Sequence, residues 1–299
     1  MARVVAVVGP TATGKSSLAI ALAQRLGGEV INADSMQLYR GMDIGTAKLA
    51  NDEQAGVPHH LLDIWEVTAT ASVADYQSRA RACIDELLAR GITPVLVGGS
   101  GLYLRAVLDR IEFPGTDPDV RAQLEGELAE VGPEHLHAKL AEVDPATALA
   151  LSPLNGRKIV RALEVIAITG GPFTSALPSY DEQLYDSVQI GLDIETSVLD
   201  ARLEQRVDVM YERGFEAEVR RLDAEGLRDG VTASRALGYA QLLAVIDGRV
   251  TEAAARTDTV RATRRFVRRQ RSWFRRDPRI TWIDGADNPT GNALRMVAS

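Results

Sequence analysis

Short apolar runs alternate with longer amphipathic segments in the first third of the chain, and this alternation is typical of a parallel α/β sheet. The apolar runs predict buried strands at residues 4–8, 29–33, 60–64 and 93–97. Segments with apolar residues three and four apart predict helices at residues 15–26, 74–90 and 102–108. We therefore expect strands and helices to alternate from the start of the chain.

The pattern changes after Phe113-Pro114-Gly115. Three further amphipathic segments, each begun by proline or a capping residue, predict helices at residues 118–131, 133–151 and 156–169. A strand is expected again at 189–194, followed mainly by helices and then by an edge strand at 279–283. The chain is therefore predicted to be an α/β core in two parts, residues 1–113 and 185–299, interrupted by a helical insertion domain at 114–184.

A glycine-rich segment follows the first predicted strand and opens the first predicted helix, which is the context expected of a phosphate loop. It reads GPTATGKS and comprises Gly9, Pro10, Thr11, Ala12, Thr13, Gly14, Lys15 and Ser16. Backbone N–H groups in such a loop converge on phosphate oxygens at the positive end of a helix. Lys15 would supply a charge to the terminal phosphate, and the Ser16 hydroxyl is a ligand for Mg²⁺.

The expected fold is therefore a P-loop NTPase-like parallel sheet with helices on both faces. A glycine-rich turn without a ligand is the weaker alternative. The motif by itself does not identify which phosphate the loop holds.

A carboxylate follows the second predicted strand, in the segment Asp34, Ser35, Met36 and Gln37. The carboxyl end of a strand beside a phosphate loop is where α/β sheets place ligands. Asp34 is thus a candidate general base, with a turn or capping role as the alternative. The next segment, GMDIGTAK at residues 41–48, suits a phosphate-facing loop because of its glycines and Lys48, but a plain surface loop is equally consistent.

The composition, 45% apolar and 25% charged, is that of an ordinary globular protein. A single cysteine, Cys83, excludes an intramolecular disulfide and a cysteine-cluster metal site, and we assign it to the core. No apolar run approaches the roughly 18–20 residues that span a bilayer. We expect a cytoplasmic monomer with no membrane partner. Ordinary surface or structural roles are assigned to His59, His60, His135 and His137.

The net charge of −7 is spread unevenly along the chain. Ten arginines and two aspartates lie from Arg256 to Arg279, so this segment carries +8 and the rest carries −15. On a helix, nine of these arginines fall within about 80° of Arg261. An RNA phosphate backbone suits such a face better than solvent alone does. Its predicted RNA contacts are Arg261, Arg264, Arg265 and Arg268, and its predicted core-facing residues are Phe266, Val267, Trp273 and Phe274.

Five sequence blocks occur in a set order: GPTATGKS, DSMQLYRGMDIGTAK, LVGGSGLYLRAV, RALEV and SRALGY. Together they resemble the signature of the tRNA dimethylallyltransferase (IPP transferase) family, and the resemblance extends from Val4 to Trp282. A lone phosphate loop is shared by many NTPases, whereas this ordered set is specific. Ser16 and Ser100 stand where threonine is common in the family, and both keep the hydroxyl.

The resemblance implies a transferase that moves a dimethylallyl group from dimethylallyl diphosphate to N6 of the adenosine 3′-adjacent to the anticodon, position 37 of tRNA, and releases diphosphate. It implies that Thr11 to Ser16 hold the diphosphate with the help of Mg²⁺, and that Asp34 accepts the N6 proton. The same loop gives the family its nucleotide-binding and ATP-binding labels. The implied tRNA contacts are Asp34, Ser35, Met36, Gln37, Ser100, Arg121, Arg157, Lys158, Ile159, Val160, Arg161, Ser234, Arg235, Ala236, Leu237, Gly238 and Tyr239.

Two other functions remain open from the residues alone. A small-metabolite kinase would use the same loop and a strand-end aspartate, but it needs no arginine-rich helix, and no apolar strand ending in a clear Walker B aspartate is recognisable. A non-catalytic RNA-binding NTPase switch would explain the loop and the basic face. It would leave Asp34, Gln37 and the SRALGY block unexplained.

Overall fold

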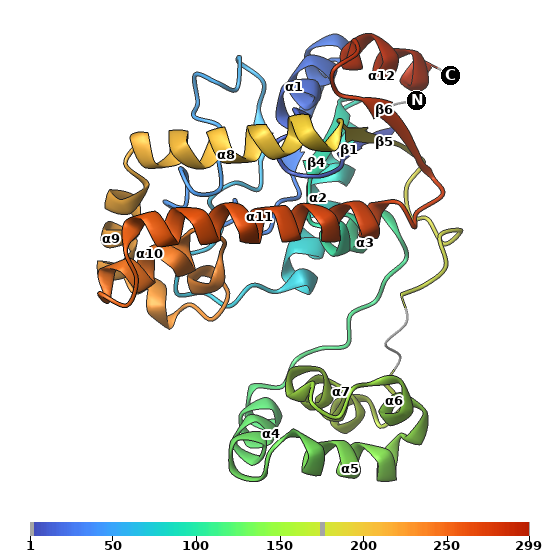
Figure 1. Cartoon of the computed structure of the whole chain (residues 1–299). Coiled ribbons are helices and arrows are strands. Elements are labelled where there is room, and N and C mark those ends of the chain that lie inside the picture. Colours follow the sequence, from blue (N-terminus) through green and yellow to red (C-terminus); the bar gives the residue numbers. More distant parts are fainter. Residues whose placement is uncertain (1–2, 174–176, 299) are drawn as a thin grey trace. The chain divides into compact units, whose positions relative to one another are not determined.

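The computed structural model describes residues 3–173 and 177–298, and six parallel strands in it form one sheet with the order β3-β2-β4-β1-β5-β6 (Figure 1). The strands are β1 Val4–Val8, β2 Gly28–Asn32, β3 His59–His60, β4 Thr93–Gly98, β5 Ser187–Asp193 and β6 Ile280–Asp284. All five pairings are parallel. The predicted parallel α/β core is confirmed, and β6 lies at an edge as expected.

Alternate residues of the central strand pack on opposite faces of the sheet, as strand geometry requires. Val5 and Val7 contact the helices α1 Lys15–Leu26 and α12 Pro289–Ala298, which Figure 1 shows together on one side. The opposite face carries Val4, Ala6 and Val8 and is covered by α2 Val73–Ala89 and α3 Gly101–Leu108. The apolar β1 therefore sits in the middle of a two-sided core.

Four α-helices lie between β5 and β6, namely α8 Thr196–Glu212, α9 Phe215–Ala224, α10 Tyr239–Ile246 and α11 Glu252–Phe274. Short 3₁₀ turns at Leu227–Asp229 and Ala233–Arg235 join α9 to α10. Phe215 and Tyr239 are completely buried in the apolar cluster that these helices share, with their rings edge to face. Helices α8 and α11 pack against each other beside the sheet (Figure 1).

Two expected elements differ from the observed ones. The strand predicted at 60–64 is only His59–His60, because Leu61 and Asp63 adopt left-handed backbone conformations with φ of 59° and 56° that end it. The helix predicted at 133–151 is two helices, α5 Pro133–Val143 and α6 Pro145–Ala150. Pro145 starts the second one because it cannot donate into a continuous helix.

Residues 111–179 form a separate compact unit, and residues 3–110 with 180–298 form the other. The smaller unit contains α4 Pro118–Val131, α5, α6 and α7 Gly156–Thr169, packed around a core of their own. The insertion had been expected to extend to residue 184. Tyr180 instead belongs with the sheet, because its ring lies under the guanidinium groups of Arg105 and Arg279.

Candidate active site

The phosphate loop lies between β1 and α1, and its shape depends on two glycines. Gly9 has φ of 135°, and a Cβ there would lie 2.2 Å from the Leu192 carbonyl oxygen, so only glycine fits. Gly14 has φ of 95° and precedes the first turn of α1. The Thr13 hydroxyl donates to the Pro10 carbonyl at 2.9 Å inside the loop. The loop is therefore preformed, with the start of α1 behind it.

Lys15 is the charged group of this loop. Its Nζ donates to the Pro10 carbonyl oxygen at 2.5 Å. Burial lowers the pKa of Lys15 to about 8, the negative charge of Asp34 partly offsets this, and the positive charge of Arg206 lowers it further. A lysine in this state is charged at neutral pH but is poorly neutralised by the protein, which favours an anionic ligand.

Asp34 follows β2, and its local backbone is fixed by two hydrogen bonds. Asp34 N donates to Asn32 Oδ1 at 3.0 Å, and Met36 N donates to Asp34 Oδ1 at 2.9 Å. The second carboxylate oxygen, Oδ2, has no hydrogen-bond partner among residues 3–173 and 177–298. The carboxylate is thus held in place with one acceptor atom available.

The neighbouring segments after β2 and β4 meet because these two strands are paired. Ser35 N donates to Ser100 Oγ at 3.1 Å, and the two hydroxyls are 3.2 Å apart. The Gln37 side chain donates to the Thr46 carbonyl at 3.2 Å. The structure therefore brings the predicted residues Asp34 to Gln37, Ser100 and the phosphate loop to one edge of the sheet.

Two cavities of about 290 Å³ each adjoin at Asp34. The phosphate cavity is lined by the phosphate loop and by polar side chains, which include Lys15, Ser16, Asn32, Gln37, Arg202 and Arg206. The apolar cavity is lined largely by side chains of α8, α10 and α11, which include Leu203, Val207, Met210, Tyr239 and Phe266. Both cavities share Thr11, Asp34, Thr46 and Arg206 as walls. Asp34 therefore stands where a phosphate site and an apolar site meet.

Arg202 and Arg206 were not anticipated from the sequence. They lie one helical turn apart on α8, and both reach the phosphate cavity. Arg206 donates to the Thr46 carbonyl at 3.1 Å and has no acidic partner within the described part of the chain. Burial lowers the pKa of Arg206, an effect that Asp34 partly offsets. The spacing of the two arginines places them on one face of a helix. Only the packing of α8 shows that this face borders the phosphate cavity.

Glu218 on α9 is a second residue that sequence reasoning missed. Its buried carboxylate accepts the backbone N–H groups of Asp43, Ile44 and Gly45 at 3.1, 2.8 and 3.3 Å. It also accepts the Tyr239 hydroxyl at 2.6 Å. One carboxylate thus fixes the loop at residues 41–48 and ties it to the SRALGY block.

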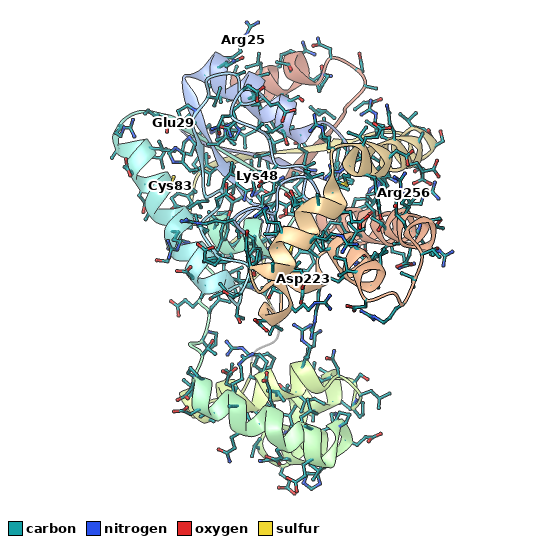
Figure 2. All side chains as sticks on the ribbon, turned by 90° about the vertical axis from the view of Figure 1, so that its left-hand side faces the viewer. Arg25, Glu29, Lys48, Cys83, Asp223 and Arg256 are labelled. Atoms are coloured by element: carbon teal, nitrogen blue, oxygen red, sulfur yellow. The ribbon has the colours of Figure 1, made fainter. Side chains whose placement is uncertain are left out.

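Lys48 in this loop forms ion pairs with Asp43 and Asp63, so its charge is not available to a phosphate. Figure 2 places it in the interior of the larger unit, where its side chain is 5% exposed. Its Nζ lies 2.6 Å from carboxylate oxygens of Asp43 and Asp63 and donates to the Tyr39 carbonyl at 2.9 Å. The charge of Lys48 is therefore already neutralised, whereas Thr46 and Ala47 of the same loop line the phosphate cavity.

The arginine-rich segment forms α11 up to Phe274, and several of its charges are paired with acids of other elements. Arg264 contacts Glu204 at 2.6 Å and Asp200 at 3.5 Å, both on α8. Arg271 and Arg275 both pair with Asp193 at the end of β5. These acids reduce the repulsion between the arginines of α11, which the sequence of the helix alone overestimates. Across the described residues, no acidic partner is found for Arg261, Arg265, Arg268 and Arg276, all of which are exposed.

The inner face of α11 is only partly the predicted core. Val267 and Phe274 are buried. Phe266 instead lines the apolar cavity, and Trp273 is 37% exposed and covers Gly101, where a Cβ would lie 2.1 Å from its ring. Phe266 thus faces an open cavity and Trp273 covers the first residue of α3, so neither ring is enclosed by packed side chains.

The SRALGY block mostly surrounds the apolar cavity. Arg235, Ala236, Leu237 and Tyr239 line it, while Ser234 donates to the Gly230 carbonyl at 2.7 Å. Gly238, with φ of 85°, packs against Phe215. Tyr239 is buried, its hydroxyl is bonded to Glu218, and it lines the apolar cavity, so its contact with tRNA stays a prediction for a base that enters this cavity.

The predicted tRNA contacts of the smaller unit divide into two groups. Arg157 and Lys158 are exposed, whereas Ile159 and Val160 are buried in its core, which corrects their assignment. Arg121 and Arg161 both bond to the buried carboxylate of Glu164. Burial alone would raise the pKa of Glu164, but these two guanidinium groups lower it on balance.

The histidines and Cys83 have the structural surroundings assigned to them. His60 pairs with Glu29 at 2.6 Å, and His59 and His137 bond to backbone carbonyls. Cys83 is half-buried on α2 (Figure 2), where burial raises its thiol pKa to about 11. Over the described ranges, no three His, Cys, Asp or Glu side chains are grouped to hold a metal ion. None of the helices in those ranges is long and apolar enough to cross a membrane.

Residues 37–277 match the protein family described as IPP transferase. The chain is 64% identical over 295 residues to a tRNA dimethylallyltransferase of Salinispora arenicola, covering 98% of this chain and 86% of that protein. A Streptomyces griseus protein of the same name is 64% identical, with 99% and 96% covered.

Two solved structures are also similar to this chain. The tRNA isopentenylpyrophosphate transferase of Bacillus halodurans has a TM-score of 0.74 at 40% identity, covering 100% of this chain and 96% of that one. A eukaryotic dimethylallyltransferase described as acting on tRNA has a TM-score of 0.84 at 25% identity, covering 100% and 78%.

Proposed function

The chain belongs to the IPP transferase family, and on that premise we propose that it transfers the dimethylallyl group of dimethylallyl diphosphate to N6 of the adenosine at position 37 of tRNA. The observation that carries this assignment is the position of Asp34. It stands between a cation-lined phosphate cavity and an apolar cavity. An allylic diphosphate needs both kinds of site, with a base at their junction.

The phosphate cavity suits the diphosphate. Residues 12–16 supply backbone N–H groups, Lys15 supplies a charge, and Arg202 and Arg206 add two guanidinium groups from α8, while Thr11 lines the cavity with its own N–H held by Gln270. Negative charge develops on the departing diphosphate as the allylic C–O bond breaks. Fixed N–H groups and cations that are already in place stabilise that charge without reorganisation.

The apolar cavity suits the dimethylallyl group and the adenine ring. The adenine N6 is a weak nucleophile, because its lone pair is delocalised into the ring. As N6 bonds to the allylic carbon, Asp34 Oδ2 accepts the proton that N6 gives up, a contribution of about 10²–10⁴-fold. The neighbouring hydrogen bond from Met36 N keeps the other oxygen fixed.

Mg²⁺ fits the donor set of the phosphate cavity. The Ser16 hydroxyl, the Asn32 amide and the Asp34 carboxylate all line it, and oxygen ligands of this kind are those Mg²⁺ prefers alongside phosphates. When bound, the ion would neutralise part of the charge of the diphosphate. Lys15, Arg202 and Arg206 would still bind the diphosphate, and Asp34 would still accept the proton of N6.

The tRNA partner is supported by the exposed arginines of α11 that have no acidic partner among residues 3–173 and 177–298, and by Arg235 at the wall of the apolar cavity. Phosphates bind such a face electrostatically. A base must leave its stack to reach Asp34, and in a single-stranded anticodon loop this costs little.

One experiment separates this function from its rivals. The protein is mixed with labelled dimethylallyl diphosphate and bulk tRNA, and in parallel with labelled ATP and tRNA. We expect label from the prenyl donor in tRNA and no phosphate transfer or hydrolysis from ATP. ATP turnover without prenylation would support a kinase or a nucleotide-dependent RNA switch and overturn the proposal.

A further inference from the structure

Gln270 joins the phosphate loop to the arginine-rich helix. It lies on α11 and is 5% exposed. Its Oε1 accepts the Thr11 backbone N–H at 3.1 Å, and its Nε2 donates to the Gly99 carbonyl at 3.0 Å. A Cβ at residue 99 would lie 2.2 Å from Nε2, so any larger residue there would displace the Gln270 amide. One side chain thus holds the loops that follow β1 and β4.

The turn of α11 around Gln270 is anchored on the same edge of the sheet. Arg271 donates to both carboxylate oxygens of Asp193 and to the Ile194 carbonyl after β5. Val267 packs in a cluster that includes Ala12 of the phosphate loop. The inner side of this helix therefore contacts the segments after β1, β4 and β5.

The opposite side of the same turns carries Arg261, Arg265 and Arg268, which are exposed and lack acidic partners among the described residues. A helix is stiff, so a ligand that holds these arginines also restrains the position of Gln270. Thr11, whose N–H Gln270 holds, lines both the phosphate cavity and the apolar cavity. A restraint on α11 is therefore transmitted to the first residues of the loop that faces the diphosphate.

We propose that Gln270 is a positioning residue that couples the binding of a polyanion on α11 to the binding of diphosphate in the phosphate loop. The coupling rests on the proposed function, in which tRNA is that polyanion. Linkage makes the effect reciprocal, so each ligand raises the affinity for the other by the same factor. Removing both amide contacts uncouples the sites without removing a group from either one.

The test measures the Kd of inorganic diphosphate with Mg²⁺ for the full chain, without tRNA and with saturating tRNA. Diphosphate cannot be turned over, so the two Kd values give the coupling factor directly. Gln270→Met keeps the side-chain length and loses both hydrogen bonds. Gln77→Met is the matched control, because Gln77 is also buried and donates to a backbone carbonyl, that of Ala106 at 2.7 Å.

We expect tRNA to tighten diphosphate binding at least about 5-fold in the wild type and in Gln77→Met, and less than about 2-fold in Gln270→Met. A wild-type factor of one, or an unchanged factor in Gln270→Met, would overturn the inference while leaving prenyl transfer intact. If the wild type binds no tRNA, both the inference and the proposed function fail.

Hydrogen exchange on the unmodified chain provides a readout that survives a poorly folding Gln270→Met. Adding tRNA should slow amide exchange at residues 9–14 as well as on α11, because the loop is held through the helix. Slower exchange on α11 with no change in the loop would contradict the coupling.

Discussion

Asp34 has one carboxylate oxygen held by Met36 N, and its other oxygen has no partner among the described residues. In Asp34→Asn the amide oxygen can keep the first bond, but the amide nitrogen cannot accept a proton. We therefore expect kcat to fall at least about 100-fold while tRNA binding is retained. Single-turnover prenylation and a tRNA binding assay measure the two quantities. Exposed Asp52→Asn is the control, and near-wild-type turnover of Asp34→Asn would reduce Asp34 to a positioning role.

Lys15 gives a pH-dependent prediction, since burial brings its pKa to about 8. Raising the pH through this value removes its charge in the free enzyme, so kcat/KM for dimethylallyl diphosphate should fall above about pH 8. Lys15→Arg keeps its charge over this range and should lose the break. A wild-type profile without a break, or the same break in Lys15→Arg, would rule out this titration as the cause.

The same shift affects stability with a definite sign. The folded-state pKa of Lys15, about 8, lies below the ordinary value of 10.5. Between these values the unfolded chain binds the proton more tightly than the folded one. The contribution of Lys15 to the free energy of unfolding therefore rises with pH across this window.

At the residue scale, the functional residues that could be predicted from the sequence are those that lie in a short local motif. Lys15, Ser16 and Asp34 were placed correctly on one sheet edge, because each follows a strand or opens a helix. Arg206, Glu218 and Gln270 were missed because each acts on a loop more than 150 positions away in the chain. No local pattern distinguishes such a residue from a surface arginine, glutamate or glutamine.

At the scale of elements, α9 contributes chiefly through Glu218, which accepts three backbone N–H groups and one hydroxyl. Glu218→Gln places an amide nitrogen against some of these donors, and we expect it to lower the free energy of unfolding by about 2 kcal/mol or more. Glu216→Gln on the same helix breaks only a surface pair with Arg220 and should cost less than about 0.5 kcal/mol.

Urea denaturation of the two variants measures the difference. KM for dimethylallyl diphosphate should also rise in Glu218→Gln, because the loop it holds carries Thr46 at the wall of both cavities. Equal stability of the two variants would show that the loop is held by other contacts.

The arginine face of α11 gives a second prediction at this scale. Arg265 and Arg268 are exposed and lack acidic partners among the described residues, whereas Arg264 is paired with Glu204 and Asp200. Replacing Arg265 or Arg268 by Gln should reduce the slope of log K against log salt for tRNA by about 0.7–0.9. Arg264→Gln is the matched control and should change the slope less. KM for the prenyl donor at saturating tRNA should be unaffected in all three.

Identical slopes in the wild type and in all three variants would reduce this face to a solvated surface. The helical period predicted which way the arginines point, because that depends only on spacing along one helix. It could not predict that acids of α8 and β5 neutralise part of the face. Nor could it show that Phe266 meets a cavity, since both facts depend on what packs against the helix.

At the scale of the whole molecule, the chain leaves and re-enters the larger unit at adjacent points. Arg110 N donates to the Glu182 carbonyl at 2.8 Å, and Asp109 and Gln183 form an antiparallel bridge. Replacing residues 111–179 by a linker of about four residues is compatible with a hairpin connection there. We expect the shortened chain to unfold cooperatively, to bind diphosphate like the full chain and to bind tRNA more weakly.

Calorimetry and the two binding assays check this prediction. Loss of cooperative unfolding would show that the two units depend on each other to fold. Unchanged tRNA affinity would remove Arg157 and Lys158 from the tRNA site. The sequence predicted the alternation of strands and helices, but the order of strands in the sheet depends on pairings between distant segments that no local pattern contains.

The central position of β1 has a consequence for synthesis. Its two neighbours are Val95–Gly98 in β4 and Ser187–Gly191 in β5, so its second partner strand is made about 180 residues after β1 itself. At about 5–20 residues per second, roughly 9–36 s pass before the second side of β1 is covered. The edge of β1 that pairs with β5 keeps its backbone N–H and C=O groups without their strand partner for that time. We therefore expect this edge to be the place where the nascent chain is most open to wrong strand pairing.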